Sequence, residues 1–197
     1  MANKIIIFVE GDTEEVLFPK IIDVYKKKRP ECKSTKCDII NIKGIGNYKA
    51  KAIRQLKNKR DEASKKNDII TSVICCYDND VFEFSINPPI NWGIVKNELE
   101  KILEKPKVKL ISIKEDIEDW LLADIDGLCK YLKAKRPEKL IGKTGFIKIS
   151  KWFKTHNKIY SKGYDCERII KHLNIELITQ TYEKELKPIR AALGIKD

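Results

Sequence analysis

The stretch Lys4–Glu15, KIIIFVEGDTEE, decides how the chain folds. It opens with the apolar run Ile5–Val9, rich in β-branched residues and without strict alternation, which is typical of a strand buried on both faces. The run stops at Glu10-Gly11, and Asp12-Thr13 are good N-cap residues for a helix that we expect to reach about Lys28. The pattern predicts a strand, a tight turn and a helix, with a carboxylate at the strand end where open α/β sheets bind ligands.

Two acidic residues of this stretch, Glu10 and Glu14, could face one point beyond the strand end. Like charges at that point repel, so they require a cation between them, an exposed carboxylate or a protonated one. The other interpretation is a solvated turn whose acids interact favourably with the helix dipole.

A second strand of the same kind is expected at Ile69–Tyr77, IITSVICCY, and it ends in Asp78-Asn79-Asp80. Alternate residues at a strand end point the same way, so both aspartates can reach one metal ion. Carboxylate oxygens are the ligands that Mg²⁺ prefers, although aspartate is also common in turns. Two acidic strand ends on neighbouring parallel strands therefore indicate a magnesium site.

These two motifs, VEGDTEE and CYDND, resemble the TOPRIM domain of topoisomerases, primases and the OLD-family (overcoming lysogenisation defect) nucleases. Glu10-Gly11 and Asp78-Asn79-Asp80 match that family's signature residue for residue. IEDWLLAD at Ile117–Asp124 and YSKG at Tyr160–Gly163 are similar to small stand-alone TOPRIM proteins near the OLD branch. The resemblance covers most of the chain, and we see no ATPase segment like that fused to full OLD proteins.

The resemblance implies a Mg²⁺-dependent nuclease that cleaves DNA or RNA phosphodiester bonds by two-metal hydrolysis, with Mn²⁺ as a substitute and water as the nucleophile. Glu10 would be catalytic, and the metal ligands would be Glu10, Asp78 and Asp80 for the first ion and Glu14 and Glu118 for the second. Glu115 is the alternative to Glu118, because both follow the later strand Val108–Ile113. Lys162, in YSKG, would be a second catalytic residue that stabilises charge on the transferring phosphate.

Composition is that of a globular chain of 197 residues, with 35% charged and 42% hydrophobic residues. We expect no membrane span, and the N-terminal apolar run is too short for a signal peptide. The six cysteines contain no CxxC pair, which favours reduced thiols in a cytoplasmic protein.

The net charge of +11 is unevenly distributed. Residues 20–66 hold 16 basic and 5 acidic residues, residues 130–172 hold 13 and 3, and residues 67–129 hold 6 and 13. Basic blocks around an acidic centre suit an enzyme that binds nucleic acid, although solvated lysine-rich faces are the alternative. The residues expected to bind nucleic acid are Lys49, Lys51, Arg54, Lys148, Lys151 and Lys154.

The predicted fold is α/β, a TOPRIM-like parallel sheet of about four strands flanked by helices, with a helical C-terminal part. The remaining strands are expected at Cys37–Ile42 and Val108–Ile113. Helices are expected at Tyr48–Lys66 and Gly93–Lys105, and two more within Cys166–Leu193. We expect a catalytic core over residues 1–130 and a basic helical extension packed on it over residues 131–197.

Two rival functions are open at this stage. The same fold could carry a nucleotidyl transferase, which a polymerisation assay would separate from a nuclease. The chain could also be a non-catalytic partner that regulates a separate ATPase, in a phage-defence pair, by analogy with stand-alone TOPRIM proteins.

Overall fold

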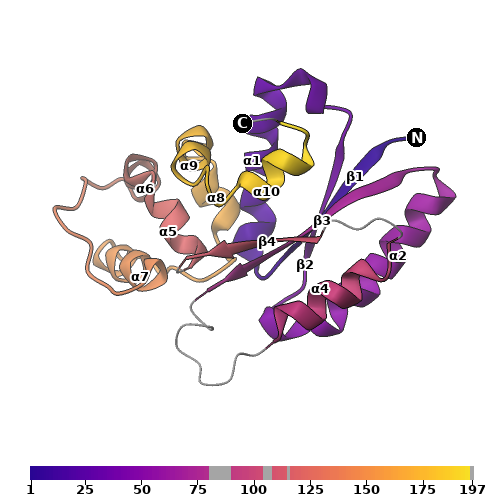
Figure 1. The fold of residues 1–197 in the computed structure, drawn as a ribbon. Coiled ribbons are helices and arrows are strands. Elements are labelled where there is room, and N and C mark those ends of the chain that lie inside the picture. Colours follow the sequence, from indigo (N-terminus) through magenta and orange to yellow (C-terminus); the bar gives the residue numbers. More distant parts are fainter. Residues whose placement is uncertain (80–89, 104–107, 115, 196–197) are drawn as a thin grey trace.

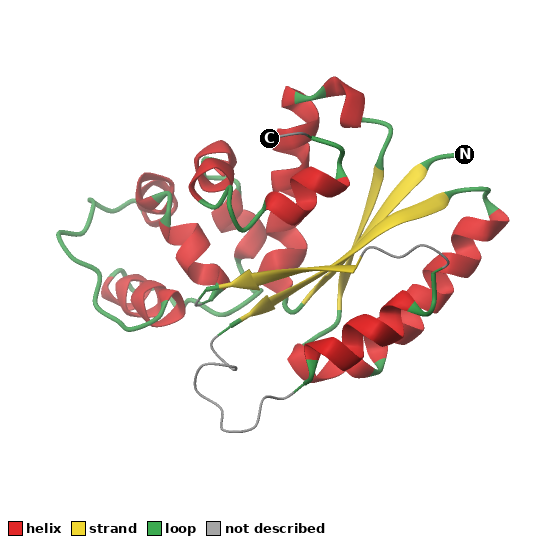
Figure 2. Ribbon diagram, viewed as in Figure 1, coloured by secondary structure: helices red, strands yellow, loops and turns green. Residues whose placement is uncertain are grey.

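The protein is built around one four-stranded parallel sheet with the strand order β2-β1-β3-β4 (Figures 1 and 2). The computed structural model describes residues 1–79, 90–103, 108–114 and 116–195. Its strands are β1 (Asn3–Val9), β2 (Lys36–Asn41), β3 (Ile69–Asp78) and β4 (Val108–Ile113). The predicted fold class is therefore confirmed, and each predicted strand agrees with the observed one to within two residues.

Helices make up most of the remaining described chain. Those before β4 are α1 (Asp12–Lys28), η1 (Pro30–Cys32), η2 (Ile45–Lys49), α2 (Lys51–Lys65) and α4 (Trp92–Glu100). Those after β4 are α5 (Ile117–Leu122), α6 (Ile125–Leu132), α7 (Gly145–Thr155), α8 (Cys166–Ile170), α9 (Ile175–Thr181) and α10 (Lys187–Ala192).

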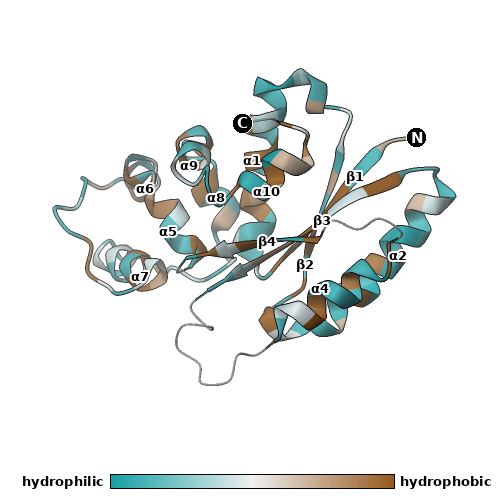
Figure 3. Cartoon of the chain, in the orientation of Figure 1, coloured by the Kyte–Doolittle hydropathy of each residue, from teal (hydrophilic) through white to brown (hydrophobic). Residues whose placement is uncertain are grey.

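The sheet is covered on both faces, which explains why its central strands are continuous apolar runs. Ile5 and Ile7 of β1 point into one cluster with α1 and the C-terminal helices, whereas Ile6 and Phe8 point into a second cluster with α2 and α4. Figure 1 shows α2 and α4 on one side and α1, α8, α9 and α10 on the other. Apolar residues gather along the strands between these layers (Figure 3).

Residues after 130 share a hydrophobic cluster with the central strand. Trp152, Ile169 and Ile189 are buried in the cluster that also holds Ile5 of β1 and Trp120 of α5. Trp120 stacks on Phe18 and Tyr182, with ring centroids 6.0 and 4.5 Å apart. The C-terminal helices therefore bury apolar surface against the sheet layer in the same way as α1 does.

Three local predictions were wrong. The N-cap of α1 is Gly11, which has no side chain to form a cap hydrogen bond. Asp12 and Thr13, the expected caps, already lie inside the helix. Residues 166–193 form three short helices, α8, α9 and α10, because Asn174 caps α9 and α10 starts anew after turns, with Pro188 in its first turn. The helix expected to reach Lys105 ends at Glu100 and continues as a turn.

Candidate active site at the carboxyl edge of the sheet

The carboxyl ends of β1 and β3 place two acidic residues side by side. Glu10 follows the last residue of β1, and Asp78 is the last residue of β3, the strand that pairs with β1. The backbone N–H of Asp78 donates to Oε2 of Glu10 over 3.3 Å. This juxtaposition follows from the parallel register, since both strands end at the same edge of the sheet.

Glu14 and Glu118 approach the same edge from the first turns of two helices. Glu14 lies in α1 and is buried, and its carboxylate occupies the space beside Gly11, where an added Cβ would be 3.0 Å from Oε2. Glu118 lies in α5, directly after β4, and its side chain has no exposed surface. A buried carboxylate is costly unless it is protonated, hydrogen-bonded or paired with a cation.

Two residues from the segment between α7 and α8 provide those partners. The Tyr160 hydroxyl donates to Oε1 of Glu118 over 2.9 Å. The Lys162 Nζ atom lies 3.3 Å from Oε2 of Glu118 and 3.9 Å from Oδ2 of Asp78. An ammonium group thus lies between the carboxylates that end β3 and begin α5.

Gly163 makes this position of Lys162 possible. Its φ of +80° is in the left-handed region, and an added Cβ would lie 2.5 Å from Cβ of Asp12 at the start of α1. The chain can therefore pass close enough to α1 to bring Lys162 over the site only with glycine at position 163.

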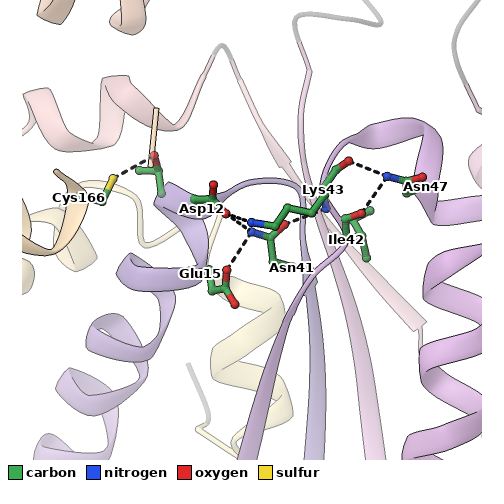
Figure 4. A network of polar contacts seen from close by, with 8 residues as sticks. Asp12, Glu15, Asn41, Ile42, Lys43, Asn47 and Cys166 are labelled. Carbon is green, nitrogen blue, oxygen red and sulfur yellow. Dashed lines mark hydrogen bonds and ion pairs between the residues drawn. The ribbon is translucent and has the colours of Figure 1, made fainter. Parts of the chain in front are cut away.

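The other two acids of the first α1 turn are engaged elsewhere (Figure 4). The Asn41 amide donates to Oδ1 of Asp12 over 2.7 Å and to Oε2 of Glu15 over 2.9 Å. Lys43 also pairs with Asp12. These contacts hold the start of α1 against the end of β2, and they leave Glu14 as the acid of this turn that reaches the site.

Burial and mutual repulsion perturb these carboxyl groups strongly. Burial, followed by the charge of Glu14, raises the pKa of Asp78 to about 9. Burial raises the pKa of Glu14 to about 7, with added repulsion from Glu118 and Glu10. Burial also raises the pKa of Glu118, although Lys162 and Tyr160 oppose that shift. Titratable groups perturbed in this way are typical of functional sites.

The residues present fit a hard divalent cation by their chemistry. The donors are carboxylate oxygens, Oδ1 of Asp78 is buried without a hydrogen-bond partner, and Lys162 already places a positive charge between Asp78 and Glu118. In the described part of the chain, no group of three or more Asp, Glu, His or Cys side chains is arranged closely enough to hold a metal ion. Two expected ligands, Asp80 and the alternative Glu115, lie outside the described residues.

The lysines and arginine expected to bind nucleic acid fall into two groups. Lys49 lies at the end of η2 and Lys51 and Arg54 at the start of α2, which follow the carboxyl end of β2. Lys148, Lys151 and Lys154 lie in α7, whose buried residues belong to the hydrophobic cluster on the opposite face of the sheet from α2. Lys148 also forms an ion pair with Asp119 of α5 at 2.9 Å.

Sequence reasoning missed three residues that organise the site. Tyr160 and Gly163 belong to the YSKG stretch, in which the sequence predicted a role for Lys162 alone. Asp116 caps α5 by accepting from Asp119 N, and its other oxygen accepts from Phe146 N of α7. A capping aspartate before the helix IEDWLL could have been found from the sequence, whereas its contact with α7 is a product of tertiary structure.

All six cysteines lie in the described chain and are free thiols, and Cys75 and Cys76 are buried within β3 as expected.

Trp92 packs on Tyr48 and Tyr77 beside the sheet, with ring centroids 4.8 and 4.4 Å apart. None of the helices in the described residues is both long and apolar enough to cross a membrane.

Comparison with known families supports the resemblance deduced from the motifs. Residues 1–59 match the family model described as "Overcoming lysogenization defect protein-like, TOPRIM domain". The chain therefore carries an OLD-like TOPRIM domain over residues 1–59, a span that includes Glu10 and Glu14 but ends before Asp78. The chain matches no curated protein and no solved structure.

Proposed function

We propose that this protein is a metal-dependent nuclease that hydrolyses phosphodiester bonds in nucleic acid. The observation that carries the proposal is the position of the Lys162 ammonium between Asp78 and Glu118 at the carboxyl edge of the sheet. Glu10 accepts from the backbone N–H of Asp78, and Glu14 is near enough for its charge to raise the pKa of Asp78. The OLD-like TOPRIM match adds support, since TOPRIM domains generally bind a divalent metal and process phosphodiesters.

Each residue has a defined task in this proposal. Glu10 and Asp78, with Asp80, would hold one Mg²⁺ or Mn²⁺ ion, and Glu14 and Glu118 would hold a second. Bound there, the ions would neutralise phosphate charge and lower the pKa of a water molecule. Because burial raises the pKa values of Asp78 and Glu14, cation binding would displace protons from these side chains, so metal affinity should weaken as the pH falls.

Lys162 would bind the phosphate that is being cleaved. Its side chain is 52% exposed, so the ammonium can exchange its contact with Glu118 for one with a phosphate oxygen. A cation held at that point stabilises the negative charge that develops in the transition state, an effect worth roughly 10²–10³-fold in rate.

The test is cleavage of labelled DNA and RNA by the purified chain in Mg²⁺, Mn²⁺ or EDTA. We expect shorter products with either metal and none in EDTA. Asp78→Asn and Glu14→Gln should abolish cleavage, whereas Glu15→Gln, in the same helix turn but bonded to Asn41, should retain it. Cleavage in EDTA, or cleavage by Asp78→Asn at the wild-type rate, would contradict the proposal.

The same preparation separates the rival functions. Longer products on adding nucleoside triphosphates would indicate a nucleotidyl transferase. If metal neither binds nor promotes cleavage, regulation of a separate ATPase in phage defence becomes the function to test, in cells carrying Asp78→Ala.

A further inference from the structure

A groove lined by lysines lies along α7, the helix that packs against α5. It has a volume of about 640 Å³ and is formed by the second half of α7 and the segment 135–141 that follows α6. This volume is in the range of sites that bind small molecules, and so it suits one or two nucleotide units better than a whole duplex. We call this feature the α7 groove.

The charge of the α7 groove has one sign. Among the described residues that line it, every acidic or basic side chain other than His156 is a lysine: Lys135, Lys139, Lys148, Lys151 and Lys154. Such a lining attracts phosphate groups and repels cations.

Apolar side chains form a second part of the lining, which we call the floor to distinguish it from the lysines, which we call the rim. The floor includes Leu140, Ile141 and Trp152, and Ile141 leaves 66% of its surface exposed to solvent. Exposing a large aliphatic side chain to water is unfavourable, and a ligand that covered Ile141 would remove that cost. The floor and rim together suit a ligand that carries flat apolar groups along an anionic backbone.

The start of α7 is held against α5, the helix that carries Glu118. Gly145 at the start of α7 lies so close to α5 that an added Cβ would be 2.3 Å from the backbone N of Asp119. Phe146 N donates to Oδ2 of Asp116 over 2.9 Å, and Lys148 pairs with Asp119, the neighbour of Glu118. Lys148 also lines a smaller cavity of about 230 Å³ beside Ile113, the last residue of β4. A strand bound in the groove would therefore lie along the helix that packs on α5, which carries Glu118.

We propose that the α7 groove binds an unpaired stretch of nucleic acid, with its phosphates on the lysine rim and its bases on the apolar floor. This inference rests on the proposed nuclease function and narrows its substrate to single strands or to strands with a single-stranded flank. In a duplex the bases are paired and stacked inside, so they cannot cover Leu140 and Ile141. An unpaired base presents its apolar face freely.

The test is binding by fluorescence anisotropy in EDTA, which separates it from cleavage. The probes are a labelled single-stranded DNA, the single-stranded RNA of the same sequence, their duplex forms and a polyglutamate peptide. We expect tighter binding of the single strands than of the duplexes. Ile141→Asn, which removes apolar surface without adding charge, should weaken single-strand binding about tenfold and leave duplex binding nearly unchanged. Lys151→Gln and Lys154→Gln should each reduce the salt slope by about 0.7.

Matched controls carry the same changes away from the α7 groove. Lys65→Gln, at the end of α2, and Ile94→Asn, an exposed position on α4, should bind single strands like the wild type. Equal binding of duplex and single strand, an Ile141→Asn protein that binds normally, or binding of polyglutamate alone would each overturn the inference. Metal-dependent cleavage that persists in Ile141→Asn with unchanged single-strand affinity would leave the proposed function intact and reject only the groove.

Discussion

At the scale of single residues, the site is a set of carboxyl groups that are costly to ionise without a cation. Asp78 has a raised pKa of about 9 and Glu14 one of about 7, both mainly through burial. In the unfolded chain both groups ionise near pH 4. Between those pH values the folded state binds more protons than the unfolded state, so the free energy of unfolding falls as the pH rises.

We therefore expect Asp78→Asn to stabilise the metal-free protein. The stability contribution of a protonated Asp78 is fully present below about pH 4 and is lost progressively towards pH 9, so the benefit of the neutral asparagine grows over that window. At pH 7 the gain should be at least about 1 kcal/mol, since one unit of pKa shift corresponds to about 1.4 kcal/mol. Urea unfolding in EDTA at pH 5, 7 and 8.5 measures it. A variant that is less stable than the wild type at pH 7 would mean that Asp78 is a structural residue.

Lys162 also matters as a single residue. Its ammonium lies between Asp78 and Glu118, whose negative charges a metal ion would otherwise balance. We expect Lys162→Ala to lower the free energy of unfolding in EDTA by about 1 kcal/mol, a modest value because the side chain is half exposed. Added Mg²⁺ should stabilise this variant more than it stabilises the wild type, since a tethered cation no longer competes. Thermal melts with and without Mg²⁺ provide the measurement.

The control for this effect is Lys158→Ala. Lys158 lies 4.1 Å from the ring centre of Tyr131 and donates to its backbone carbonyl, so its removal should change stability without changing the response to Mg²⁺. Equal Mg²⁺ responses in Lys162→Ala and the wild type would show that lysine and metal do not share a position.

At the scale of elements, the segment between α7 and α8 is placed by one glycine. Gly163→Ala meets two obstacles, a φ of +80° and the Cβ of Asp12 at 2.5 Å, whereas Gly194→Ala meets a φ of +81° in open space. Gly194→Ala should cost about 1–2 kcal/mol for the backbone conformation alone. Gly163→Ala should cost more and should also reduce cleavage, because the segment that carries Lys162 has to move away from α1.

Chemical denaturation of the two variants, together with the cleavage assay, separates backbone strain from displacement of the segment. Equal stabilities and equal cleavage rates for the two proteins would indicate that the close approach of Gly163 to α1 has no functional role.

At the scale of the whole molecule, metal binding should be visible as added stability. A ligand that binds only the folded state raises the free energy of unfolding by about 2.7 kcal/mol at one hundred times its dissociation constant. We expect Mg²⁺ or Mn²⁺ to raise the melting temperature of the wild type and to have little effect on Asp78→Asn. Ca²⁺ and a matched concentration of NaCl distinguish a specific site from general screening. A uniform response of both proteins to all salts would argue against a metal site at Glu10 and Asp78.

The sequence by itself determined the sheet and its acidic edge. Apolar runs without alternation predict strands buried on both faces, and an acid directly after such a run must lie at the end of its strand. This is why the four strands and the neighbouring positions of Glu10 and Asp78 could be predicted from local patterns. The family match over residues 1–59 rests on the same kind of local signal.

Only the tertiary structure decided which polar residues share the site. Helix periodicity does not tell whether Asp12, Glu14 or Glu15 faces the strand end, and the choice depends on Asn41 and Lys43 drawing two of them towards β2. Lys162 reaches Asp78 from 84 residues along the chain because Gly163 allows a close approach to α1. The VEGDTEE and YSKG stretches named Glu14 and Lys162 as candidates through the resemblance, but their contacts arise from packing between distant segments and are not given by a local pattern.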